Sequence, residues 1–95
     1  MRRDASATLL ALVFLAGCDS VDPSRVVVRG AGSDEFLKLR AGPGLGYSTI
    51  LGLPDGTSLD RHDCVTEMGQ LWCRVSLSAA PHITGYVSAD YLSAP

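Results

Sequence analysis

Residues 39–56 read Leu-Arg-Ala-Gly-Pro-Gly-Leu-Gly-Tyr-Ser-Thr-Ile-Leu-Gly-Leu-Pro-Asp-Gly, and they indicate the fold class of this chain. Three glycines and a proline within residues 42–46 exclude a helix, because glycine destabilises a helix and proline cannot complete its hydrogen bonds. Residues 50–53 are short and apolar, as in a strand. The Pro54-Asp55-Gly56 segment that follows is a turn signal. We therefore expect a long glycine-rich loop between short strands.

Short extended segments separated by turns continue along the rest of the chain. We expect strands at residues 26–28, 36–40, 50–53, 59–65, 71–77 and 83–87. Residues 88–92 are typical of a single helical turn. No segment repeats apolar residues with a helical period over a useful length. The sequence therefore predicts an all-β domain, and a small barrel is favoured because closure removes exposed sheet edges.

The composition fits one small globular domain. The 95 residues carry a formal net charge of -2, and 46% of them are hydrophobic while 19% are charged. This hydrophobic content excludes a disordered acidic tail, and the charge balance argues against nucleic acid as a partner. The residues expected in the core are Leu39, Leu53, Leu59, Val75, Val87 and Leu92.

Residues 1–17 have the pattern of an export signal. Arg2 and Arg3 precede an apolar run at residues 7–16. Ten residues at the helical rise cover about 15 Å, roughly half of a bilayer core, which suits a signal peptide and not a permanent membrane span. A short buried core helix is the alternative, but the run has no amphipathic face.

The apolar run ends in Leu15-Ala16-Gly17-Cys18, which resembles the lipobox of bacterial lipoproteins. The resemblance implies cleavage before Cys18 and attachment of lipid to its sulfur and its new amino group. Several acyl chains give stable anchoring without crossing the bilayer. We therefore expect the protein to face outward from a bacterial membrane in the cell envelope. Asp19 favours retention at the inner membrane in some bacteria, which leaves the choice of membrane open.

Lipidation of Cys18 leaves two of the three cysteines, Cys64 and Cys73, as an even pair. Compartments outside the cytoplasm permit disulfides, so we expect these two residues to form one. Their spacing also fits a hairpin in which Cys64 faces Cys73. Residues 67–70 would then form a four-residue connection. A reactive cysteine is the alternative, but no close pair of cysteines supports it.

Several segments resemble the bacterial SH3 domain, in matching order. These segments are Leu39-Arg40-Ala41-Gly42-Pro43-Gly44, Tyr47-Ser48-Thr49-Ile50, Leu53-Pro54-Asp55-Gly56-Thr57, Trp72-Cys73-Arg74-Val75, Thr84-Gly85-Tyr86-Val87-Ser88 and Tyr91-Leu92. Tyr86 stands where this family often has tryptophan. The resemblance implies an SH3-like barrel of five to six short strands, with the glycine-rich loop beside the tryptophan. Three regions follow: a signal peptide at 1–17, the lipidated cysteine with a short tether at 18–24, and the domain at 25–93.

Four aromatic residues are the candidate ligand-binding set, and they are Tyr47, Trp72, Tyr86 and Tyr91. Aromatic grooves bind proline-rich peptides or stack on sugars. Tyr47 is the preferred contact, because an aromatic residue in a loop needs a reason to be exposed. The alternative is that Trp72 and Tyr91 only close the barrel.

The sequence offers no catalytic set, metal site or cofactor site. His62, Asp63 and Cys64 are adjacent, but neighbouring side chains of a strand point to opposite faces. His82 adds no close metal-ligand spacing. The glycine-rich loop lacks the lysine and the helix of a phosphate-binding loop.

Binding is therefore the expected activity, and the chain is not expected to be an enzyme. The favoured function is a membrane-anchored module that recognises a cell-wall peptide, peptidoglycan or an envelope protein. The alternative is an accessory lipoprotein whose domain packs permanently against a partner subunit. The sequence does not identify the ligand or the oligomeric state.

Overall fold

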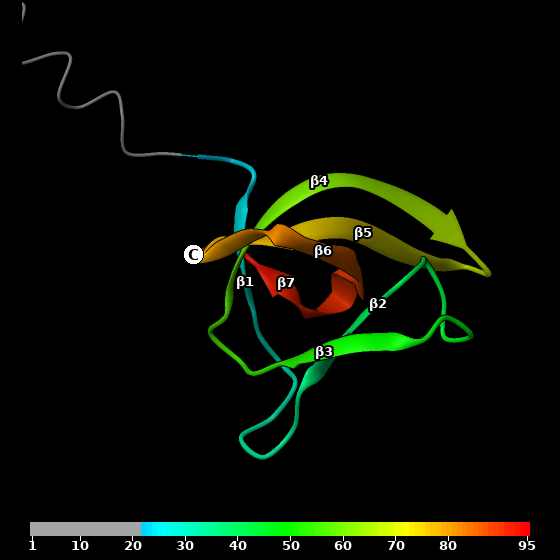
Figure 1. Cartoon of the computed structure of the whole chain (residues 1–95), viewed down its shortest axis with the longest axis horizontal. Helices are drawn as coiled ribbons and strands as arrows, with labels where there is room; N and C mark the ends of the chain where they lie inside the picture. The colour runs from blue at the N-terminus through cyan, green and yellow to red at the C-terminus, as the bar shows by residue number, and fades with distance from the viewer. Residues whose placement is uncertain (1–21) are drawn as a thin grey trace, which may run out of the picture.

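The computed structural model describes residues 22–95, and they form one curled antiparallel sheet, a half-barrel (Figure 1). The strands are β1 (Arg25–Val28), β2 (Leu37–Arg40), β3 (Thr49–Leu53), β4 (Ser58–Glu67), β5 (Gln70–Leu77), β6 (Ala80–Ser88) and β7 (Leu92–Ser93). A single 3-10 turn, η1 (Ala89–Tyr91), precedes β7. The strand order is β3-β2-β6-β5-β4-β1-β7. The all-β prediction is confirmed, with seven strands in place of five to six because the two-residue β7 pairs with β1.

The core fills the concave side of the curled sheet. Five of the six predicted core residues are fully or almost fully buried, namely Leu39, Leu53, Leu59, Val75 and Val87. The sixth, Leu92, is only partly buried, because it lies in the edge strand β7 and packs on the margin of this cluster. Val26, Val28, Leu37 and Cys73 complete the buried cluster.

The β4–β5 hairpin has the predicted register, in which Cys64 pairs with Cys73 and Val65 with Trp72. Its connection, however, is shorter than predicted. Glu67 pairs with Gln70, so only Met68 and Gly69 form the turn. Both have positive φ, 53° and 80°, as the tight primed hairpin turns require. The four-residue connection is therefore wrong, because methionine at the first turn position gives little sign of a left-handed backbone.

A disulfide bond joins the two hairpin strands. The sulfur atoms of Cys64 and Cys73 lie 2.05 Å apart, with Cys64 exposed and Cys73 buried in the core. The register shifts between Arg61 and Cys64, so His62 and Asp63 bulge from β4. By the loop-entropy estimate, closing about ten residues contributes on the order of 2.5–3 kcal/mol to stability. The cross-link thus holds the long hairpin beyond the bulge.

A close approach between β2 and β6 curls the sheet. The two strands pair through Arg40 and Tyr86. Next to this pair, a Cβ atom on Gly85 would lie 2.7 Å from Leu39 Cγ and 2.8 Å from the Arg40 carbonyl oxygen. Only a residue without a side chain fits there. Gly85 therefore lets β2 cross close over β6 and brings Leu39 into the core.

The start of the domain is fixed to β4. The Arg61 backbone N–H donates to the Ser24 carbonyl oxygen at 2.8 Å. The hydroxyl and backbone N–H of Ser24 donate to the Asp22 carboxylate, and these hydrogen bonds lower the pKa of Asp22. Of the predicted tether, residues 22–24 thus lie against the domain. The signal peptide, Cys18 and Asp19 lie outside the described residues.

The Gly85→Ala variant is expected to lose about 1–3 kcal/mol of unfolding free energy, because its methyl group overlaps Leu39 and the Arg40 backbone. Urea unfolding measures this loss. Gly46→Ala is the matched control, since a Cβ there meets no atom within 4 Å. Equal stability of the two variants would contradict the close approach described here.

Candidate functional site

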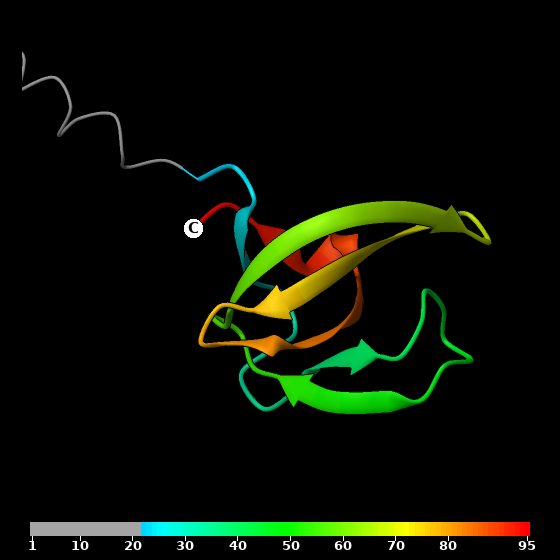
Figure 2. The ribbon, with the colours of Figure 1, turned by 45° about the horizontal axis from the view of Figure 1, so that its top comes forward.

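An open groove of about 630 Å³ lies between the glycine-rich loop and the tip of the β4–β5 hairpin. We call it the main groove. Its lining residues are Pro43, Gly44, Leu45, Gly46, Tyr47, Glu67, Met68, Gln70, Trp72, Ser88, Asp90 and Tyr91. The loop forms one wall, the hairpin the other, and η1 one end; Figure 2 shows the loop and the hairpin tip on the same side of the domain. The volume falls in the usual range of small-ligand and peptide pockets, about 300–1,000 Å³.

Arg40 holds the loop wall in place from the end of β2. Its Nη1 donates to the carbonyl oxygens of Leu45 and Tyr47, at 3.2 and 3.0 Å. The backbone closes the same loop, since Ala41 N–H donates to the Ser48 carbonyl oxygen at 2.9 Å. Because one guanidinium group binds both carbonyl oxygens, Arg40 fixes the curvature of a loop that has little secondary structure.

Tyr47 combines packing within the loop with exposure to the groove. Its ring lies directly against Gly42, so any side chain at position 42 would displace it. The residue nevertheless remains 50% exposed. The close contact orients the ring, and the exposed half is available for a ligand.

The opposite wall comes from the hairpin turn. Met68 is fully exposed at the tip, where its positive φ directs the chain back into β5. Methionine adapts its shape to apolar partners because its side chain is unbranched and polarizable. Met68 was not among the predicted site residues, because a four-residue connection does not define which way its side chains point.

Ser88 connects the hairpin wall to η1. Its hydroxyl accepts from Gln70 Nε2 at 2.8 Å and from the Asp90 backbone N–H at 3.3 Å. The same residue is the N-cap of η1, so the predicted helical turn at residues 88–92 is confirmed as a 3-10 turn. One hydroxyl thus sets the position of Asp90 and Tyr91 relative to β5.

The structure brings together three of the four predicted aromatic residues. Tyr47, Trp72 and Tyr91 line the same groove; the two tyrosines are exposed, and Trp72 has only 6% of its surface exposed. Trp72 therefore packs into the domain and offers one edge to the groove. Tyr86 lines neither cavity described here, because it pairs with Arg40 and Arg74 on the outer side of the sheet.

Two carboxylates give the main groove its charge. Glu67 and Asp90 are the only charged side chains in its lining. Neither forms an ion pair within residues 22–95. Sequence reasoning did not select them, because they are 23 positions apart and meet only through the β5–β6 pairing and η1.

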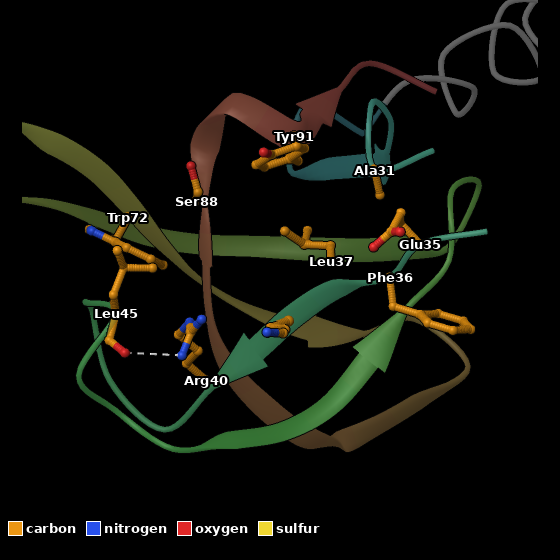
Figure 3. Close-up of a pocket in the computed structure, with 10 residues that line it drawn as sticks. Ala31, Glu35, Phe36, Leu37, Arg40, Leu45, Trp72, Ser88 and Tyr91 are labelled. Carbon is orange, nitrogen blue, oxygen red and sulfur yellow. Dashed lines mark hydrogen bonds between the residues drawn. The ribbon is translucent and has the colours of Figure 1, made fainter. Parts of the chain in front are cut away.

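A second cavity of about 330 Å³, which we call the side pocket, adjoins the main groove (Figure 3). The two share Leu45, Trp72, Ser88 and Tyr91. The side pocket extends from these shared residues along β2 and the segment before it, and its other lining residues are Ala31, Glu35, Phe36, Leu37, Lys38 and Arg40.

Other chemistry has no assembled site in residues 22–95. No three His, Cys, Asp or Glu side chains of this part gather as metal ligands would. His62 lies in the β4 bulge, where its Nε2 is 2.9 Å from Ser76 Oγ. The same residues contain no helix long and apolar enough to cross a bilayer. The chain matches no protein-family model, no curated protein and no solved structure.

The Arg40→Met variant is expected to loosen the loop wall, because it loses both hydrogen bonds to Leu45 and Tyr47 while keeping an aliphatic side chain. Chymotrypsin cleaves after leucine and tyrosine, so limited proteolysis within residues 41–48 should become several-fold faster. Arg61→Met is the control, since its side chain has no hydrogen bond in the described residues. Unchanged cleavage of the Arg40 variant would contradict the positioning role of Arg40.

Proposed function

We propose that this protein is a membrane-anchored binding module that recognises an extended peptide of the bacterial cell envelope. The preferred ligand is a cell-wall peptide of peptidoglycan, and a peptide segment of an envelope protein is the close alternative. The main groove is the binding site. The observation that carries the proposal is the pair of exposed tyrosines, Tyr47 and Tyr91, in a groove that Trp72 also lines.

The shape of the groove supports a narrow, extended ligand. Its two walls come from a loop and a hairpin, and its floor from the edge of Trp72. Exposed aromatic rings provide a large contact area and lose little side-chain entropy of their own on binding. They can therefore bind a ligand that has few side chains to contribute. Leu45 is 77% exposed beside them, which adds an apolar contact at the loop wall.

The charge of the groove supports a ligand with an amino group. Glu67 and Asp90 face solvent without a cationic partner in the described residues. Carboxylates attract a ligand ammonium group and repel an anionic polymer such as nucleic acid. Cell-wall peptides commonly contain a diamino acid, which supplies this amine.

The anchor follows from the lipobox resemblance at residues 15–18. In this proposal Cys18 carries the lipid, and Arg25 begins the domain seven residues later. Seven extended residues span at most about 25 Å. The groove would then act close to the membrane that holds the lipid, on wall material or proteins within this distance.

The second candidate is an accessory lipoprotein that packs permanently against a partner subunit. Exposed apolar side chains away from the groove favour it. Phe36 is 60% exposed and Ile50 is 50% exposed, both near the free edge of the sheet at β3. Apolar residues at an edge strand suit a lasting contact with another chain.

The Tyr47→Ala variant tests the peptide-binding proposal. We expect the wild-type protein to sediment with purified peptidoglycan in a saturable manner, and Tyr47→Ala to bind at least ten-fold more weakly because half of the ring is available to the ligand. Its melting temperature should fall only slightly.

Leu71→Ala is the control for Tyr47→Ala, because Leu71 is 44% exposed and does not line the main groove. A wild-type protein that does not sediment without a second protein would support the accessory role instead. If Tyr47→Ala and the wild-type protein sedimented equally, the main groove would not be the binding site.

The anchor has its own test by mass spectrometry of protein isolated from bacterial membranes. The amino-terminal peptide is expected to begin at Cys18 and to carry the mass of a diacylglyceryl group. The Cys18→Ala variant should remain unprocessed and unlipidated. An unmodified Cys18 in the mature protein would contradict the anchor while leaving the groove proposal intact.

A further inference from the structure

The side pocket extends the binding surface beyond the main groove. Figure 3 shows Leu45 and Trp72 at one end of the pocket, Arg40 beside them, and Tyr91 across the top. Because four residues line both cavities, a ligand lying over Trp72 reaches the two together. Such a ligand can therefore place one part in the main groove and another part in the side pocket.

The charge reverses between the two cavities. The main groove contains only the carboxylates of Glu67 and Asp90. The side pocket is lined by Lys38 and Arg40, which both come from β2. Neither forms an ion pair within residues 22–95.

Arg40 keeps hydrogen-bonding capacity after holding the loop. Both of its hydrogen bonds in the described residues come from Nη1, which leaves the N–H groups of Nε and Nη2. Lys38 is exposed and adds three donors. Glu35 also lines the pocket, but Figure 3 places it beside Ala31 and Phe36, at the opposite end from Arg40. Arg40 therefore gives a positive charge to the pocket end next to the main groove, away from Glu35.

We propose that the side pocket binds a carboxylate of the same peptide whose amine lies in the main groove. The ligand class is thus a dipolar peptide, with an ammonium group near Glu67 and Asp90 and a carboxylate near Lys38 and Arg40. This inference rests on the proposed function of the main groove. It gives a role to the two cationic side chains beside the aromatic residues, neither of which forms an ion pair within residues 22–95.

Lys38 is the only lysine in the chain, which permits a direct test. Reductive methylation with ¹³C-formaldehyde adds methyl groups to its amine and preserves the charge. The probe is a synthetic cell-wall stem tetrapeptide with one side-chain amine and a free C-terminal carboxylate. Its C-terminal amide is the matched comparison. We expect the Lys38 methyl signal of the full chain in detergent to shift with the acid and not with the amide.

Titration calorimetry with the same two peptides gives the affinities. The acid is expected to bind about three- to ten-fold more tightly than the amide, the size of one partly exposed ion pair. Lys38→Gln should abolish this preference. Arg61→Gln should retain it, because Arg61 is an exposed cation on β4 that lines neither cavity.

Three results would overturn the inference. Equal affinity for acid and amide would remove the carboxylate subsite and leave the peptide-binding proposal standing. An acid preference that survives in Lys38→Gln would place the carboxylate elsewhere. No binding of either peptide to the wild-type protein would overturn the cell-wall-peptide function as well.

Discussion

The contact between Gly85 and Leu39 is the constraint on which the rest of the molecule depends. β6 lies inside the sheet, and β2 can pair with it only where the glycine leaves space for Leu39 and the Arg40 backbone. This approach curls the sheet and closes the core over Leu39. It also fixes where β2 ends, and the glycine-rich loop starts at that point. The position of the loop over Trp72 is thus a consequence of packing at Gly85.

The hairpin wall depends on different interactions. β4 runs ten residues, and its second half lies beyond the bulge at His62 and Asp63. The residues of this half are exposed, so burial contributes little to their order. The Cys64–Cys73 disulfide and the tight turn at Met68 and Gly69 compensate by restricting the strands directly. The loop wall is therefore held by the packing at Gly85 and the hydrogen bonds of Arg40, and the hairpin wall by a covalent bond and a tight turn.

Local sequence patterns predicted the strands and turns of this fold. The features that they did not predict depend on tertiary contacts. The spacing of Cys64 and Cys73 was sufficient for the register between this pair and the turn, but the bulge at His62 and Asp63 shifts the register on its other side. The two-residue turn was not predictable in this way, since Met68 adopts a positive φ that methionine rarely has. Of the four aromatic residues selected from the sequence, Tyr47, Trp72 and Tyr91 line one groove, and Tyr86 lies outside it because its side of β6 depends on the β2–β6 pairing. Local sequence could not predict Glu67 and Asp90 as a pair, because they line the same groove only after three strands have paired.

Trp72 shows how so small a domain combines stability with recognition. A chain of this length cannot dedicate large side chains to a ligand alone, because its core is barely sufficient for folding. Trp72 buries most of its surface, and its remaining edge lies where the main groove and the side pocket meet. Arg40 positions the loop wall through its hydrogen bonds to Leu45 and Tyr47, whereas Lys38, Glu67 and Asp90 are exposed and form no ion pair within residues 22–95. Under the proposed function, these three exposed side chains can therefore change ligand preference at little cost in stability, while the core fixes the ring of Trp72.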